Sequence, residues 1–189
     1  MKKILFILGG WLVAIGGYAQ GAAPEPSEAK VPNEVGQGTT PGRSSRPDTS
    51  LLHFFAGHWT GKGEFAGGRA IEAEVDFALS LDSCWIVYEH RDRAPNSYKA
   101  TSMWGSDRSG QFVAYTFDNF HGHRQWVSNG WIGGKLVLNG SSPLPSGGVM
   151  FEHFIYEKVG PAQFKMTYEV SGDGIKWQMG DWLVFTKVQ

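Results

Sequence analysis

The stretch AIEAEVDFALS, residues 70–80, decides the fold class of this chain. Every second residue is apolar, and the positions between them include two glutamates and an aspartate. Because successive side chains of a β-strand point to opposite faces, this pattern predicts a strand with one face in a core and the other in water. The apolar face consists of Ile71, Ala73, Val75, Phe77 and Leu79.

The same alternation continues along the chain, and glycine-rich turns separate its repeats. QFKMTYEV at 163–170 is a second clear case, and GSDRSG at 105–110 and SGDG at 171–174 are typical turn sequences. From turn to turn, the sequence predicts about ten strands. They span residues 58–65, 70–80, 84–92, 97–105, 111–118, 124–132, 134–140, 148–158, 162–170 and 175–187.

A short helix is predicted before the first strand, in PDTSLLHFFAG at 47–57. Asp48 or Ser50 can cap its first turn, and Leu51, Leu52 and Phe55 can face inward. No other part of residues 51–189 has a convincing helical period. About ten short antiparallel strands predict an all-β up-and-down barrel, because closure removes both exposed sheet edges. An open sandwich is the alternative.

The N-terminal 50 residues differ in character from the rest. Residues 1–21 read as a secretory signal peptide, with Lys2 and Lys3, a short apolar run and a small-residue exit, so we expect the mature chain to begin near Ala22. Residues 22–50 hold five of the nine prolines and no aromatic residue, which predicts a disordered linker. We therefore expect a secreted or periplasmic protein, although an uncleaved N-terminal anchor is the alternative.

Two stretches of the domain at 51–189 carry a family resemblance. LLHFFAGHWTGKGEF at 51–65 is similar to the opening of calycin-type barrels, in which a helical turn leads into Gly-x-Trp. The segment at 104–140, from WGSDRSGQF to KLVLNG, resembles secreted bacterial lipocalin-like domains of unknown function. Those domains are related in shape to fatty-acid-binding proteins and nitrobindins. The resemblance implies a barrel that binds a small molecule.

The resemblance also implies structural roles for three residues. Trp59 should plug the closed end of the barrel, and Gly57 and Gly61 should allow close backbone approach beside it. The last strand lacks the arginine that lies across this tryptophan in lipocalins. Lys176 or Lys187 would have to take that place.

The expected ligand surface lies on strands that mix apolar and hydrogen-bonding residues. A barrel of this size can enclose one small ligand in a mostly apolar pocket with a few polar groups. Tyr88, Arg91 and Tyr115 are candidates for binding a carboxylate end of that ligand. The aromatic wall would come from Phe112, Phe117, Trp126 and Phe151, with Met150 beside them. The alternative is that these aromatic residues fill a solid core.

His121 and His123 stand one residue apart in FDNFHGHRQW, residues 117–126. In a strand both could reach one metal ion, with Asp118 or His153 as a third ligand. Gly122 and the neighbouring runs indicate a hairpin loop instead, so we expect rim residues, no metal and no cofactor. Cys84, the one cysteine, is expected to be a buried apolar residue, and it excludes an internal disulfide.

The function that these observations favour is an exported module that binds a hydrophobic or amphipathic small molecule. The net charge of −1 gives no basic patch for nucleic acid. No membrane span is expected in the mature chain. One alternative is a barrel enzyme, a hydrolase or isomerase using His90, Asp118, His121 or His153. The other is a structural or interaction domain with a filled core.

Overall fold

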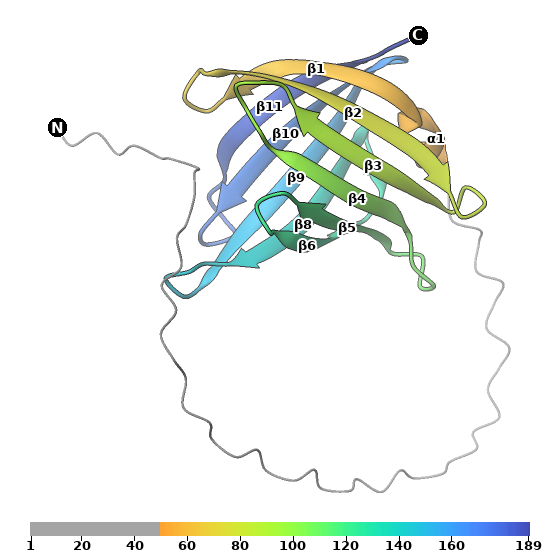
Figure 1. Ribbon diagram of the computed structural model, residues 1–189. Helices are drawn as coiled ribbons and strands as arrows, with labels where there is room; N and C mark the ends of the chain where they lie inside the picture. The colour runs from red at the N-terminus through yellow and green to blue at the C-terminus, as the bar shows by residue number, and fades with distance from the viewer. Residues whose placement is uncertain (1–49) are drawn as a thin grey trace, which may run out of the picture. The chain divides into compact units, whose positions relative to one another are not determined.

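Ten antiparallel strands close into a barrel in the computed structural model, which describes residues 50–189 (Figure 1). The helix α1 (Ser50–Phe55) precedes the first strand, and a two-residue strand, β7 (Trp131–Ile132), is added to the ten. The barrel strands are β1 (Gly57–Phe65), β2 (Ala70–Ser80), β3 (Trp85–Asp92), β4 (Lys99–Ser106), β5 (Phe112–Asp118), β6 (His123–Ser128), β8 (Lys135–Pro143), β9 (Val149–Gly160), β10 (Gln163–Ser171) and β11 (Gln178–Lys187).

Each barrel strand pairs with its neighbour in the chain, and β1 pairs with β11. The barrel closes between β6 and β8, where a single residue pair, Val127 with Asn139, joins the two strands. The all-β barrel predicted from the alternation is confirmed, and residues 70–80 form β2 with the predicted bounds. Ile71, Ala73, Val75 and Phe77 are all buried.

One predicted strand, at 124–132, is broken in the structure. β6 ends at Ser128, and the chain turns at Gly130, whose φ of 79° lies in the left-handed region that favours glycine. The Ser128 hydroxyl accepts a hydrogen bond from the Gly130 amide at 3.1 Å. The last two residues of the prediction therefore belong to β7, which pairs with β8.

Aromatic side chains fill the end of the barrel that α1 covers. Phe55 and Trp59 are completely buried, and the Trp59 indole donates a hydrogen bond to the Phe55 carbonyl at 2.6 Å. The helix buries the three residues predicted to face inward. The surrounding rings, each in contact with another of the set, are Phe77, Trp104, Tyr156, Phe164 and Phe185.

Two glycines of β1, Gly57 and Gly61, flank Trp59 at the end of the barrel that α1 covers. A Cβ atom on Gly61 would lie 2.5 Å from the Phe185 ring, so only glycine fits there. Gly57 has a φ of 126°. Of the two lysines considered, Lys187 lies over the Trp59 ring, with its ammonium nitrogen 5.2 Å from the centroid. Lys187 thus makes a cation–π contact with Trp59, in the place that the resemblance assigns to an arginine.

Cys84 corrects one expectation, because it is exposed. β3 begins one residue later, at Trp85, and the preceding turn contains Leu81, Asp82 and Ser83 with positive φ angles. The turn lifts Cys84 away from the core.

The expected signal peptide at 1–21 and all but the last residue of the linker at 22–50 lie outside the described residues. In the part that is described, no helix is long and apolar enough to cross a membrane.

Candidate functional site

The end of the barrel opposite α1 is polar inside. The side chains here follow from strand alternation: His90 and Asp92 continue the inward face of β3, Asp118 ends that of β5, and Arg124 begins that of β6. Several strands therefore bring titratable groups into one interior space. We call this group the mouth cluster: His90, Asp92, Tyr98, Asp118, Arg124, Glu152, Tyr168 and Asp181.

One half of the mouth cluster is a buried hydrogen-bonded chain. His90 Nε2 lies 2.8 Å from Asp92 Oδ1, and His90 Nδ1 lies 2.7 Å from the Tyr88 hydroxyl. The side chains of His90 and Asp92 are only 5% and 4% exposed. A carboxylate oxygen accepts, so His90 Nε2 is the donor to Asp92. The two contacts hold the imidazole ring in one orientation.

The other half is centred on the Arg124 guanidinium. Its Nη1 donates to Asp118 Oδ2 at 2.9 Å, and its Nε lies 3.2 Å from Glu152 Oε1. Both carboxyl groups are 2% exposed. The Tyr168 hydroxyl also donates to Glu152 Oε1, at 2.6 Å. Glu152 Oε2 is buried and has no hydrogen-bond partner in the part of the chain that the structure describes.

Burial shifts the acidity of several groups in the mouth cluster. It raises the pKa of Asp181 to about 7, and the negative charge of Asp92 contributes in the same direction. It raises the pKa of Tyr98 to about 12, although Arg124 opposes that change. The pKa of Tyr168 also rises because of burial and the charge of Glu152. Each of these three groups is poorly solvated and has charged neighbours from the same cluster.

Tyr98 covers this space from the loop between β3 and β4. Its ring lies 5.5 Å from the His90 ring on one side and stacks at 6.1 Å with Phe120, from the loop between β5 and β6, on the other. Phe120 is 61% exposed. The two rings therefore lie between the mouth cluster and the solvent.

The seven residues expected to bind a ligand do not form one site. Tyr88, Phe112 and Trp126 are buried on the inner face of the barrel. The other four point outward, because their strand positions are odd-numbered in β3, β5 and β9, where even-numbered residues face inward. This corrects the expected placement of Arg91, Tyr115, Phe117 and Phe151.

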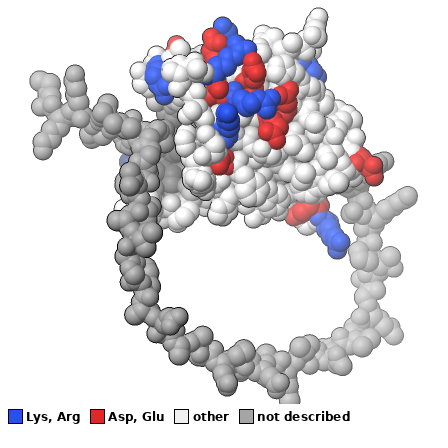
Figure 2. All heavy atoms as spheres, in the orientation of Figure 1, with Lys and Arg blue, Asp and Glu red and all other residues white. Residues whose placement is uncertain are grey.

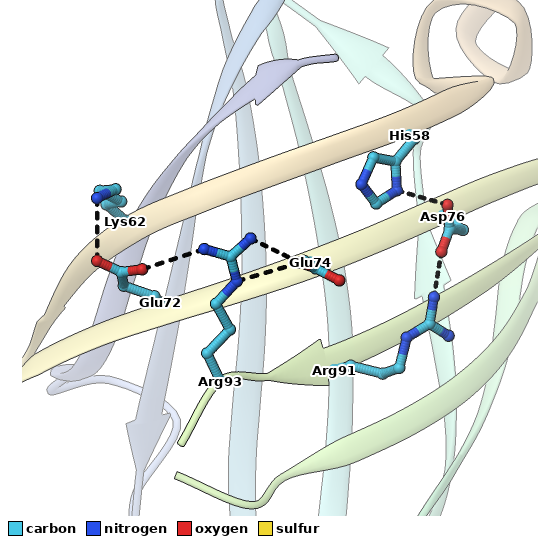
Figure 3. A network of polar contacts seen from close by, with 7 residues as sticks. All are labelled: His58, Lys62, Glu72, Glu74, Asp76, Arg91 and Arg93. Atoms are coloured by element: carbon cyan, nitrogen blue, oxygen red, sulfur yellow. Dashed lines mark hydrogen bonds and ion pairs between the residues drawn. The ribbon is translucent and has the colours of Figure 1, made fainter. Parts of the chain in front are cut away.

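Arg91 belongs to a network of charges on the outer wall, over β1, β2 and β3 (Figure 2). It pairs with Asp76, whose other oxygen lies 2.6 Å from His58 Nδ1 (Figure 3). Two glutamates lie farther along β2. Glu74 is 2.6 Å from Arg93, and Glu72 is 3.4 Å from Arg93 and 3.0 Å from Lys62. Acids and bases alternate along this outer network, so its charges are largely compensated.

Two open hollows on the described part of the chain are lined mainly by outward-facing side chains. The first, of about 390 Å³, lies over β3, β4 and β5, and brings Arg91 and Phe117 together. The second, of about 320 Å³, lies over the junction of β6 and β8 and includes Phe151. Thus two of the predicted residues do meet, on the outside of the barrel.

His121 and His123 lie at the hairpin between β5 and β6, as the loop interpretation predicted. Both are exposed, and His121 has a φ of 65°. Asp118 is occupied by Arg124 and by the amides of Phe120 and Gly122, each at 2.9 Å. His153 stacks on Trp177 at 3.4 Å. Within residues 50–189, no three His, Cys, Asp or Glu side chains are grouped so that they could hold a metal ion.

Sequence reasoning missed most of the mouth cluster, above all Glu152, Tyr168 and Asp181. One signal was available: Glu152 stands on the same strand face as Phe154 and Tyr156, so the alternation already placed a charged residue inward. Asp92 and Arg124 give the same signal on β3 and β6. An inward charge on an otherwise apolar strand face is a marker of a functional interior.

Comparison with known proteins supports the fold. The chain is similar to the crystal structure of Rv2717c from M. tuberculosis, with a TM-score of 0.53 and 15% sequence identity. The alignment covers 76% of this chain and 99% of that chain. This protein has an all-β fold, a closed ten-stranded antiparallel barrel. No family model and no curated protein matches its sequence.

Proposed function

We propose that this protein is an exported small-molecule binding module, and that its ligand is amphipathic and binds at the mouth cluster. The observation that carries the proposal is Glu152, a carboxyl group 2% exposed inside the barrel with one oxygen unpartnered. A buried polar atom without a partner costs about 1–3 kcal/mol. A ligand that donates a hydrogen bond to this oxygen would remove that cost.

The composition of the interior argues against a purely structural barrel. A buried ion pair is often no more stabilising than apolar residues of the same volume. The α1 end of this barrel is filled with apolar rings, whereas the mouth end holds four carboxyl groups, Asp92, Asp118, Glu152 and Asp181. Groups with perturbed pKa values cluster at functional sites. The polar half of the interior therefore favours ligand recognition over packing.

The amphipathic character follows from what borders the mouth cluster. Phe154 packs between Trp126, at 5.0 Å, and Tyr168, at 4.8 Å, and separates the polar groups from the aromatic end. Phe65, the last residue of β1, pairs with Asp181 on β11 and also packs against the core. An apolar tail would contact these rings while a polar head meets the mouth cluster. Entry requires the Tyr98–Phe120 pair to move, since the two rings lie over the cluster.

The binding proposal is tested on protein purified in native form from its own cells. Native mass spectrometry should show an adduct of a few hundred daltons that organic extraction releases. The adduct should be lost in Glu152→Gln and kept in Glu157→Gln, an exposed-side control on the same strand that pairs with Lys135. A bare mass for the wild-type protein, with no thermal shift in a small-molecule library, would contradict the proposal.

Export rests on the N-terminal sequence alone. The basic, apolar and small-residue order of residues 1–21 predicts cleavage near Ala22 and a location outside the cytoplasm. N-terminal sequencing of protein from the native source should begin at or near Ala22. A mature protein that begins at Met1 would contradict export.

A second candidate function is proton-transfer catalysis at the same mouth cluster, by a hydrolase or isomerase. The observation that favours it is the pairing of Asp181, whose pKa of about 7 suits a general acid or base, with the oriented His90–Asp92 pair. Of the four residues considered for an enzyme, only His90 and Asp118 lie in the cluster. Turnover of a co-purifying molecule that Asp181→Asn abolishes, with binding retained, would favour this function.

A further inference from the structure

The charges of the mouth cluster are unbalanced. Among the described residues of the cluster, Arg124 is the one guanidinium, and it pairs with Asp118 and Glu152, whereas Asp92 and Asp181 have no cationic partner of their own among the arginines and lysines. No lysine belongs to the cluster. Besides Arg124, the one nitrogen base of the cluster is His90, which contacts Asp92 and Tyr88. The interior at this end therefore offers an excess of hydrogen-bond acceptors and of negative charge.

Most of these acceptors are already used by the protein. Asp118 accepts from Arg124 and from two loop amides, and Asp92 accepts from His90. Glu152 Oε1 accepts from Tyr168 and contacts Arg124. Two acceptors remain over: the buried Glu152 Oε2 and the carboxyl group of Asp181, which accepts no side-chain hydrogen bond within residues 50–189.

The two remaining acceptors flank one side chain. Tyr168 is directly opposite Asp181 in the pairing of β10 with β11, and its hydroxyl donates to Glu152. Asp181 and Glu152 both raise the pKa of Tyr168, so their charges act on the same hydroxyl. The two acids therefore both neighbour Tyr168, Asp181 through the strand pairing and Glu152 through the hydroxyl group.

We propose that the region around Tyr168 binds a cationic, hydrogen-bond-donating head group, such as a primary ammonium, between Glu152 Oε2 and Asp181. The inference deepens the proposed function and rests on it. An ammonium group offers three donors and one positive charge, which match two unpartnered acidic acceptors. Hydrogen bonds between ionised partners are about twice as strong as neutral ones.

The same geometry disfavours a carboxylate head. A ligand carboxylate would have to compete for Arg124, whose positive charge Asp118 and Glu152 already share. It would also lie beside several carboxyl groups, and like charges repel strongly where solvation is poor. We expected Tyr88, Arg91 and Tyr115 to bind a ligand carboxylate. The proposed head group carries the opposite charge.

The test uses three probes with the same tail and different heads: hexylamine, 1-hexanol and hexanoate. Binding to the full-length protein is measured by isothermal titration calorimetry at pH 8, where the amine is protonated and Asp181 is ionised. Hexylamine should bind at least about tenfold more tightly than hexanoate, with 1-hexanol between them. At pH 5, where Asp181 holds its proton, hexylamine should bind several-fold more weakly.

Substitutions assign the effect to the two acceptors. Glu152→Gln and Asp181→Asn keep the side-chain shape, and each should weaken hexylamine binding about tenfold while leaving 1-hexanol within about twofold. Glu157→Gln should change neither. Thermal unfolding of each variant verifies that it is folded, and the two acid variants provide independent readings if one of them is unstable.

Two results would overturn the inference while leaving the proposed function standing. One is hexanoate that binds as tightly as hexylamine. The other is an equal loss of affinity for hexylamine and for 1-hexanol in Glu152→Gln and in Asp181→Asn. The two acids would then act only through packing. If none of the three probes binds, the inference is overturned, and the proposed function is decided separately by the native adduct and the small-molecule library.

Discussion

Val127 on β6 and Asn139 on β8 form the single residue pair that closes the barrel. The Asn139 side chain adds a hydrogen bond to the Val127 carbonyl at 3.2 Å. Elsewhere in the described barrel, neighbouring strands pair over at least six residues, as β5 and β6 do. The junction of β6 and β8 is therefore the weakest seam of the barrel.

Replacing Asn139 should loosen this seam. Asn139→Ala removes the hydrogen bond to the Val127 carbonyl and should cost about 0.5–1.5 kcal/mol of unfolding free energy. Amide hydrogen exchange in β6 and β8 should accelerate, whereas exchange in β2, which is paired on both sides, should stay unchanged. Equal acceleration in all strands would show that the seam opens only with global unfolding.

Trp59 should contribute a large share of the stability. It is fully buried and contacts Phe164 at 4.9 Å between ring centroids. Trp59→Ala should lower the unfolding free energy by about 3–5 kcal/mol, measured by denaturant titration. A loss under about 1 kcal/mol would contradict its role as the plug of the closed end.

Gly61 should not accept a larger side chain. In Gly61→Ala the new Cβ would meet the buried Phe185 ring at 2.5 Å, and such overpacking costs about 1–3 kcal/mol. Gly67→Ala is the matched control, because nothing lies within 4 Å of the Cβ it would add. The two variants are compared by thermal unfolding. Equal melting temperatures would mean that the Phe185 ring yields at no cost.

Asp181 should make the protein less stable as the pH rises towards neutrality. Its folded-state pKa is about 7, above the ordinary value of 3.8, so between these values the folded state keeps a proton that the unfolded state has lost. Unfolding free energy should fall over this window by about 2–4 kcal/mol and level off above it.

The Asp181→Asn variant isolates this contribution. The difference in unfolding free energy between variant and wild type should increase from about pH 4 to pH 7 in favour of the variant. Asp92, Glu152, Arg124 and Tyr168 face the same space, and all are retained in both proteins. A difference that does not change with pH would show that Asp181 titrates normally.

His121 and His123 should be dispensable for stability. Both are exposed at the β5–β6 hairpin, so the double substitution to alanine should change the unfolding free energy by no more than about 0.5 kcal/mol. Metal content, measured by elemental analysis of untagged protein, should be the same with and without the substitutions. Stoichiometric zinc or iron that disappears with them would show a metal site instead.

The sequence by itself determined most of the strands, the short helix and the burial of Trp59. Each rests on a local signal: alternation in 70–80, inward apolar residues in 51–55, and the Gly-x-Trp at 57–59. Alternation also separates the two faces of a strand, so it places Tyr88 and Arg91 on opposite sides of β3. It does not say which face is enclosed where both carry apolar and polar residues.

Only the tertiary structure decided which residues meet at the mouth. Asp92, Arg124, Glu152 and Asp181 come from β3, β6, β9 and β11, and their proximity depends on the order, register and closure of the strands. Local propensity carries no information about those distances. The unpartnered oxygen of Glu152 and the raised pKa of Asp181 arise from burial, which exists only once all ten strands enclose the same space.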